Sequence, residues 1–327
     1  MLSFERQLSG NTMMSLSYVG TQGHRLLADK ESNPGNPALC LGLASQGCGP
    51  FAEDGTYTLP SGQTIQSTRT VFQNGLGSNG IFVTEANSGY NALEISLRHT
   101  SPRAAILAAY TYSKSMDNAS SWGPGVSDAG EQLNPINPRL SRSLSAFDLT
   151  HNFVVSYSYM LPFDKFFQAN RLTRGWIVTG ITRYNTGFPV TINEQDDNSL
   201  LGTFCTGPTC SVIDTPNFTP GPFNFSDPRS GKSYFNTSLF SLESLGQLGN
   251  SNRRFFHGPG NATWDLGLLK DLPLTEAKKL EFRVEFFNIF NHANFGTPQG
   301  DIINSSFGFS TSAGDPRIGQ LAIKFDF

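Results

Sequence analysis

The chain has 327 residues, of which only 15% are charged, while 33 are Gly, 19 are Pro and 27 are Phe. The hydrophobic fraction of 38% lies below that of an ordinary globular domain, and this composition does not fit a helical enzyme. A net charge of −3 gives no basic surface for nucleic acid. The sequence also lacks a run of about 18 apolar residues, so it contains no transmembrane helix. These features favour a β-barrel with long polar loops.

Apolar and polar residues alternate in short segments along the whole chain, which is the period of a β-strand with two different faces. Tight-turn sequences such as Ser9-Gly10-Asn11 separate some of these segments, as in a hairpin. The phase of alternation is ambiguous only in the segment that begins at Trp176. In chain order, we predict nine strands at residues 2–8, 14–19, 93–98, 104–112, 153–160, 176–192, 264–268, 279–286 and 318–327.

The connections between these strands are alternately short and long. Strict alternation of this kind is typical of outer-membrane barrels, which have short turns on the periplasmic side and long loops outside. All the short turns are expected at the same end of the sheet as the end of the last strand, because the strands run alternately up and down. We therefore expect an antiparallel transmembrane β-barrel in the bacterial outer membrane. The long loops span roughly residues 21–88, 113–147, 193–261 and 292–317.

The two faces of the predicted strands differ in polarity, most clearly at residues 279–286 and in the closing strand. We expect the polar face to line the lumen. The charges on this face could contact a plug, but we favour the interpretation that they only solvate the lumen. We expect the apolar face to meet lipid. The lumen-facing residues are Glu94, Arg98, Glu281, Arg283, Glu285, Lys324 and Asp326, and the lipid-facing residues are Leu280, Phe282, Val284, Phe286, Leu321, Ile323, Phe325 and Phe327.

Nine is an odd number, whereas bacterial single-chain barrels have an even number of strands. We therefore interpret the sequence as about nine strands of a larger barrel and expect an open or strained sheet. The first residues do not show the basic and apolar regions of a signal peptide, so we expect the export signal to lie outside this sequence.

The four cysteines form two local pairs, Cys40 with Cys48 and Cys205 with Cys210. Each pair lies in a stretch rich in Gly and Pro, without Cys-x-x-Cys spacing and without a nearby His, so zinc binding is not expected. We predict two short disulfide-closed loops in an oxidising compartment. The alternative is two pairs of inert thiols in a reducing compartment.

No pattern in the sequence indicates catalysis or a cofactor. The five histidines are scattered, and a Gly-x-Ser-x-Gly elbow is absent, so we predict that the protein is not an enzyme. Glu194, Asp196, Asp197 and Asn198 cluster at an outer strand end. We interpret them as a solvated acidic loop, with a calcium site as the alternative.

Several stretches resemble the C-terminal barrel region of TonB-dependent outer-membrane receptors, especially the Oar-like group. The resemblance covers essentially the whole chain, and the order and spacing of the motifs are more specific than any one of them. The stretches are Gly89–Leu93 with Ser96–Arg98, Tyr110–Ser115, Asp148–Asn152 (DLTHN), Glu285–Asn291 (EFFNIFN) with Asn294-Phe295, and Pro316-Arg317.

This resemblance implies a barrel of about 22 strands around a plug domain, with residues 1–327 as its C-terminal part and the plug and N-terminal domains absent. It implies uptake of a large or scarce nutrient across the outer membrane; the alternative is a structural or adhesive protein whose surface loops bind partners. The expected partners are outer-membrane lipid and the assembly machinery, which would read the last strand ending at Phe327. An inner-membrane energy-transducing complex would join only if the missing N-terminal part is supplied.

Overall fold

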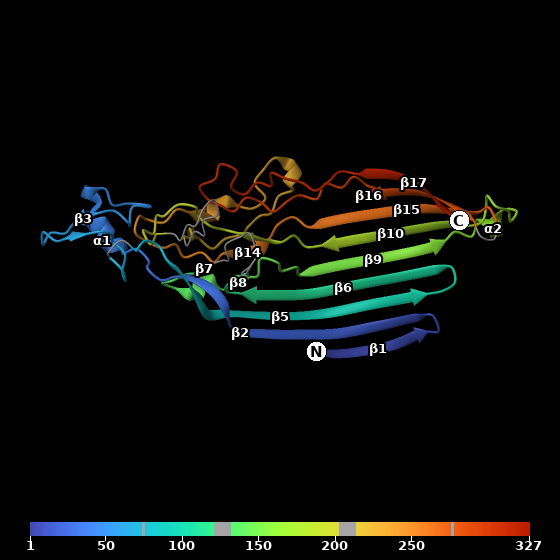
Figure 1. Cartoon of the computed structure of the whole chain (residues 1–327), viewed down its shortest axis with the longest axis horizontal. Coiled ribbons are helices and arrows are strands. Elements are labelled where there is room, and N and C mark those ends of the chain that lie inside the picture. Colours follow the sequence, from blue (N-terminus) through green and yellow to red (C-terminus); the bar gives the residue numbers. More distant parts are fainter. Residues whose placement is uncertain (74–75, 121–131, 203–213, 276–277) are drawn as a thin grey trace.

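The computed structural model describes residues 1–327 except 74–75, 121–131, 203–213 and 276–277. Its main element is one antiparallel sheet whose strands follow the order β1-β2-β5-β6-β9-β10-β15-β16-β17 (Figure 1). The short strands β7 and β8 pair with β2 and β6 at its margin. This sheet confirms the all-β class and the nine main strands predicted from the sequence.

The nine strands of this main sheet are β1 (Leu2–Ser9), β2 (Thr12–Glu31), β5 (Gly80–Thr100), β6 (Ala104–Asp117), β9 (His151–Met160), β10 (Trp176–Asn185), β15 (Asn261–Pro273), β16 (Lys279–Phe287) and β17 (Ile318–Asp326). The remaining strands are β3 (Tyr57–Thr58), β4 (Thr64–Ile65), β7 (Gln132–Leu133), β8 (Ser143–Leu144), β11 (Pro189–Thr191), β12 (Asn217–Phe218), β13 (Phe240–Ser241) and β14 (Arg254–His257). The helices are α1 (Pro37–Gly42) and α2 (Phe163–Phe166), with 3-10 turns η1 (Ala44–Gln46), η2 (Pro138–Ser141), η3 (Pro228–Ser230) and η4 (Thr237–Leu239).

The described helices are all too short or too polar to cross a membrane. The short connections lie together at one end of the main sheet and the long connections at the other (Figure 1). The tight turn between β1 and β2, closed by the pairing of Ser9 with Thr12, belongs to the first group. The arrangement confirms the sorting of turns and loops expected from the sequence.

The strands β2 and β5 are much longer than predicted. Alternation ends near Val19, yet β2 continues to Glu31, which pairs with Gly80 of β5. The register shifts between Gly23 and Ala28, and each shift changes which residues point to which face. The period of two is therefore lost in the sequence although the strands remain paired.

The strand predicted for residues 176–192 is divided in two. β10 ends at Asn185, and β11 leaves the main sheet to pair with β14. A side chain at Gly187 would collide with the carbonyl oxygens of Gly258 and Pro259, so the chain passes there against another backbone segment. The register also shows which residues of β10 share a face, which the alternation left ambiguous. Tyr184 lies on the same face as its partner Phe153, and Ile181 lies with its partner Ser156 on the opposite face.

The register places the two predicted groups of side chains on opposite faces of the main sheet. Glu281 pairs with Lys324, and Phe282 pairs with Ile323. We call the face that carries the charged group the polar face and the other the apolar face. Each direct pair in an antiparallel sheet shares one face. Following the pairs from β5 to β17 puts Glu94, Arg98, Glu281, Arg283, Glu285, Lys324 and Asp326 on the polar face.

The main sheet is open in the described residues, since β1 and β17 each pair on one side only. All neighbours in the nine-strand order are antiparallel, so these two edge strands run in the same direction. They could pair with one another only as parallel strands. This agrees with the open sheet expected from an odd number of strands.

The long connections pack into a separate body, which we call the outer loop assembly (residues 32–79, 118–150, 186–260 and 288–317, within the described ranges). Its largest apolar core is built mainly from aromatic residues of the segments around β11–β14 and of the last loop. Phe235 is only 1% exposed and packs against Phe240, Phe256 and Phe307. The full set of buried core residues is Val190, Ile192, Phe235, Leu239, Phe240 and Phe256.

We predict that Phe235→Ala loosens the outer loop assembly while the main sheet stays folded. Truncating a buried Phe costs about 3–5 kcal/mol of unfolding free energy. Limited proteolysis of the folded protein should therefore cut residues 186–260 much faster in this variant. Phe51→Ala is the matched control, because Phe51 is 60% exposed and its truncation should change the cutting rate little. Equal rates for both variants would contradict the packing described here.

Candidate functional site

The polar face of the main sheet forms one wall of a broad cavity. Arg98, Ser156 and Asp265 lie in one row across the strands, and Thr179 and Glu285 lie in the next. All five residues line the cavity. A wall of this kind is wetted by water and presents hydrogen-bonding groups to whatever lies against it.

The charged residues nearest the turn end of this wall are paired with one another. Glu281 accepts from Arg283 Nε, and Asp326 lies 2.9 Å from Lys324 Nζ and 3.5 Å from Lys279 Nζ. The pairs of Asp326 are partly exposed, so each contributes little to stability, whereas Glu281 is buried beneath Arg283. The network pairs the charges of the polar face with one another.

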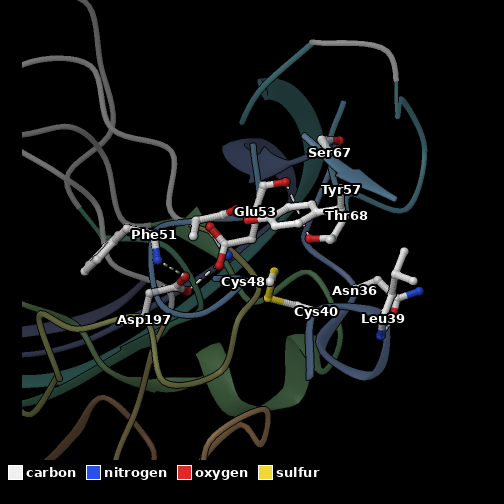
Figure 2. The surroundings of a disulfide bond; sticks show 12 residues. Asn36, Leu39, Cys40, Cys48, Phe51, Glu53, Tyr57, Ser67, Thr68 and Asp197 are labelled. Atoms are coloured by element: carbon white, nitrogen blue, oxygen red, sulfur yellow. Dashed lines mark hydrogen bonds between the residues drawn. A yellow bond between two sulfur atoms is a disulfide. The ribbon is translucent and has the colours of Figure 1, made fainter. Parts of the chain in front are cut away.

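A small lobe around α1 and β3 forms one end of the outer loop assembly (Figure 1), and it contains a disulfide (Figure 2). Cys40 of α1 and Cys48 are joined, with their Cα atoms 5.3 Å apart. Asn36 caps α1 by accepting from Leu39 N, and Leu200 from a distant loop packs on the same core. The disulfide expected for this pair is therefore present, whereas the pair Cys205 and Cys210 lies outside the described residues.

A buried guanidinium fastens this lobe to the end of β2. Arg69 donates two hydrogen bonds to the carboxylate of Asp54, at 2.6 and 2.9 Å, and one to Asn33 O. Its side chain is only 2% exposed. Two parallel bonds from a guanidinium to a carboxylate hold geometry as well as charge, so residues 32–72 form a rigid unit.

Two of the four residues predicted as a solvated acidic loop are instead buried, and Asp196 and Asn198 are half-buried. Glu194 and Asp197 are both 0% exposed. Asp197 accepts from the backbone N–H groups of Phe51 and Gly202, at 3.1 and 3.0 Å. The sequence interpretation was wrong because the segments that cover these side chains, around Phe51 and Asp214, are distant in the chain.

The folded loops bring these acids against other acids that sequence reasoning did not connect with them. Glu53 meets Asp197, and their carboxyl groups point toward one another (Figure 2). Burial, followed by the hydrogen bond with Asp197, raises the pKa of Glu53 to about 9. Glu194 meets Glu243, and burial followed by this contact raises the pKa of Glu194 to about 8.

The described residues contain no group of three or more His, Cys, Asp or Glu side chains arranged to hold a metal ion. The carboxyl groups come together as pairs. Asp214 lies close by, and burial raises its pKa to about 7 although Ser199 donates to it from both its hydroxyl and its backbone N–H. The arrangement concentrates acidic side chains inside the outer loop assembly, where burial disfavours their charged forms.

The stretches that resemble TonB-dependent receptors hold the bases of the loops. Asp148 accepts from Ser115 N and lies 2.8 Å from His257 Nε2. Asn288 donates to the carbonyls of His292 and Asp315 and closes the last loop. These contacts are structural, and they explain why the motifs fall where long loops leave the strands.

The sequence was compared with known protein families and with curated proteins. The model of the outer membrane beta barrel domain family matches residues 1–320. A comparison with curated proteins gives no match.

Solved structures are similar over 99% of this chain but at low identity. They include the outer membrane transporter YddB from Escherichia coli (10% identity, TM-score 0.45, 31% of that chain). They also include FpvA from P. aeruginosa bound to heterologous pyoverdines (14%, 0.40, 27%) and the ferric-catecholate import receptor Fiu from K12 E. coli (11%, 0.37, 34%). The chain spans about a third of the length of each of these structures. Since the family model covers nearly all of its residues, the chain belongs to the outer membrane beta-barrel domain family and is a protein of the bacterial outer membrane.

Proposed function

We propose that this chain is the C-terminal part of the barrel of a TonB-dependent receptor-like transporter, which takes up a large or scarce nutrient across the outer membrane. The observation that carries the proposal is the open sheet with one polar face, one apolar face and every long connection at the same end. The motifs that resemble TonB-dependent receptors support the same assignment.

The open edges support a larger barrel. Hydrocarbon offers no hydrogen-bonding partner to an unpaired strand, so a membrane sheet must close. The edge strands β1 and β17 run in the same direction and cannot close this sheet in antiparallel fashion. Further strands, supplied by a segment outside residues 1–327, would complete a lumen wide enough for a plug and a large substrate.

The exposed side chains support the proposed orientation of the two faces. Leu321 is 81% exposed and Ile323 is 69% exposed, although both are large and apolar. The same face of β5 leaves Leu93, Ile95 and Leu97 exposed. A continuous exposed apolar face of this size requires an apolar partner, which lipid supplies. The polar face with Arg98 and Glu285 then lines the lumen.

A structural or adhesive role is the second candidate. The outer loop assembly has its own aromatic core, a disulfide and buried ionic contacts, so it is built as a stable surface. Such a surface suits the binding of partners without transport. The two candidates differ in whether anything crosses the membrane.

We predict that Val284→Arg destabilises the complete barrel in lipid by about 2–4 kcal/mol, because Val284 would face hydrocarbon near mid-membrane. Gln320→Arg is the matched control at almost the same depth, since Gln320 lies on the polar face opposite Glu285. Denaturant titration of the barrel folded into lipid vesicles measures both free energies of unfolding. A cost near zero for Val284→Arg would remove the assignment of the apolar face to lipid.

Transport is tested in cells that express the complete protein. We expect at least one compound in a complex medium to disappear faster than in cells without the protein, and this depletion to stop when the proton gradient across the inner membrane is collapsed. Mass spectrometry of the medium measures the depletion. Binding of a partner at the cell surface without energy-dependent depletion would support the adhesive role and reject transport.

A further inference from the structure

Glu194 and Glu243 form a buried carboxylate pair that neither proposed function uses. Glu194 follows β11 and Glu243 follows β13, and the two residues are 0% and 6% exposed. Their carboxyl groups are close enough to share a hydrogen bond. Two carboxylates this close and this deeply buried repel one another unless a proton or a cation lies between them.

Most of the oxygen atoms of this pair lack a partner. Glu194 Oε2 and both carboxylate oxygens of Glu243 accept no hydrogen bond from the described residues and are shielded from solvent. Glu194 Oε1 accepts from Asn198 Nδ2 at 2.9 Å. Buried polar atoms without a partner are rare in proteins, because each loses its hydration without compensation.

The neighbours of the pair make the local charge more negative. Besides the two glutamates themselves, the charged residues with the largest effect on the two carboxyl groups are Asp196 and Asp214, both acidic. These neighbours add to the repulsion between the two carboxylates.

The second pair, Glu53 with Asp197, differs in this respect. Arg69 lowers the pKa of Glu53 by its charge, and Asp197 already accepts two backbone hydrogen bonds. In that pair only Glu53 Oε1 is buried without a partner among the described residues, whereas the pair of Glu194 and Glu243 has three such oxygens. The contrast favours Glu194 and Glu243 as the pair that a cation would stabilise.

We propose that Glu194 and Glu243 bind one calcium ion, with the side-chain amide oxygen of Asn198 as a third ligand and water completing the shell. Calcium takes six to eight oxygen ligands, and carboxylates bind it through one or both oxygens. The site offers no imidazole or thiolate, which zinc prefers. A half-turn of the Asn198 amide presents Oδ1 in place of Nδ2.

The position of this ion would connect distant parts of the outer loop assembly. Asn198 O accepts from Gly246 N at 2.6 Å, and Gly246 lies against Leu41 of the disulfide lobe. Asp197 reaches the same lobe through Phe51 N. A calcium ion therefore braces residues 194–198 against residues 243–246. The inference uses the loop orientation of the proposed function, in which this surface faces the calcium-containing exterior.

The test uses the complete protein, folded and purified in detergent micelles. Equilibrium dialysis should show one calcium ion bound per chain, with a dissociation constant of about 10⁻⁴ to 10⁻³ M, typical of extracellular sites. Calcium should also slow proteolysis within residues 186–260. Glu243→Gln should weaken binding about tenfold or more and abolish this protection, because it removes a charged ligand. Glu53→Gln is the matched control and should change neither measurement.

Heat-modifiable gel mobility reports whether each variant folds. If Glu243→Gln does not fold, Glu194→Gln and Asn198→Ala provide the test. The first should behave like Glu243→Gln, and the second should give a smaller loss. Absence of calcium binding by the folded wild-type protein would overturn the proposal and leave a shared proton. Binding that survives both Glu→Gln substitutions, or that Glu53→Gln abolishes, would overturn it as well. None of these measurements involves uptake, so the outcome is independent of the transport experiment.

Discussion

The structure depends on the pairing of backbone N–H and C=O groups in the main sheet. Lipid supplies no hydrogen bonds, so every strand in the membrane needs a neighbour on both sides. The strands from β2 to β16 have two such neighbours, whereas β1 and β17 have one. An exposed apolar face of this size needs an apolar surrounding, and the charges of the polar face need water or partner charges. The placement of the loops at one end follows from the up-and-down order of the strands.

The outer loop assembly obeys a different rule because it has apolar cores of its own. Its long segments must bury apolar area of their own, and they do so around Phe235 and around the Cys40–Cys48 disulfide. Loops that fold this tightly also enclose polar groups. The buried acids Glu53, Glu194 and Glu243 are a consequence of that enclosure, and their lost hydration is offset only where a partner is supplied.

The two regions also differ in how far the sequence predicts them. Alternation is a local signal, so it predicted the nine strands and the two faces from Glu94 to Asp326. It failed in β2 beyond Gly23, where register shifts reset the period, and at Gly187, where the chain leaves the sheet. The carboxylate pairs were beyond sequence reasoning for another reason. Asp197 and Glu53 are held together by tertiary packing, and no local pattern reports which distant segment covers an acidic residue.

In a closed barrel that contained this sheet, the direction of its two edge strands would limit how many further strands can be added. Because β1 and β17 run in the same direction, only an odd number of additional antiparallel strands can join them. An even number would again leave a parallel seam, which bacterial barrels of this kind do not contain. A barrel of about 22 strands, the plugged size class, satisfies this condition because about 13 strands would be added to the nine. The direction of the two edges thus agrees with any even-numbered barrel, including the one that the sequence motifs imply, although the two arguments use different residues.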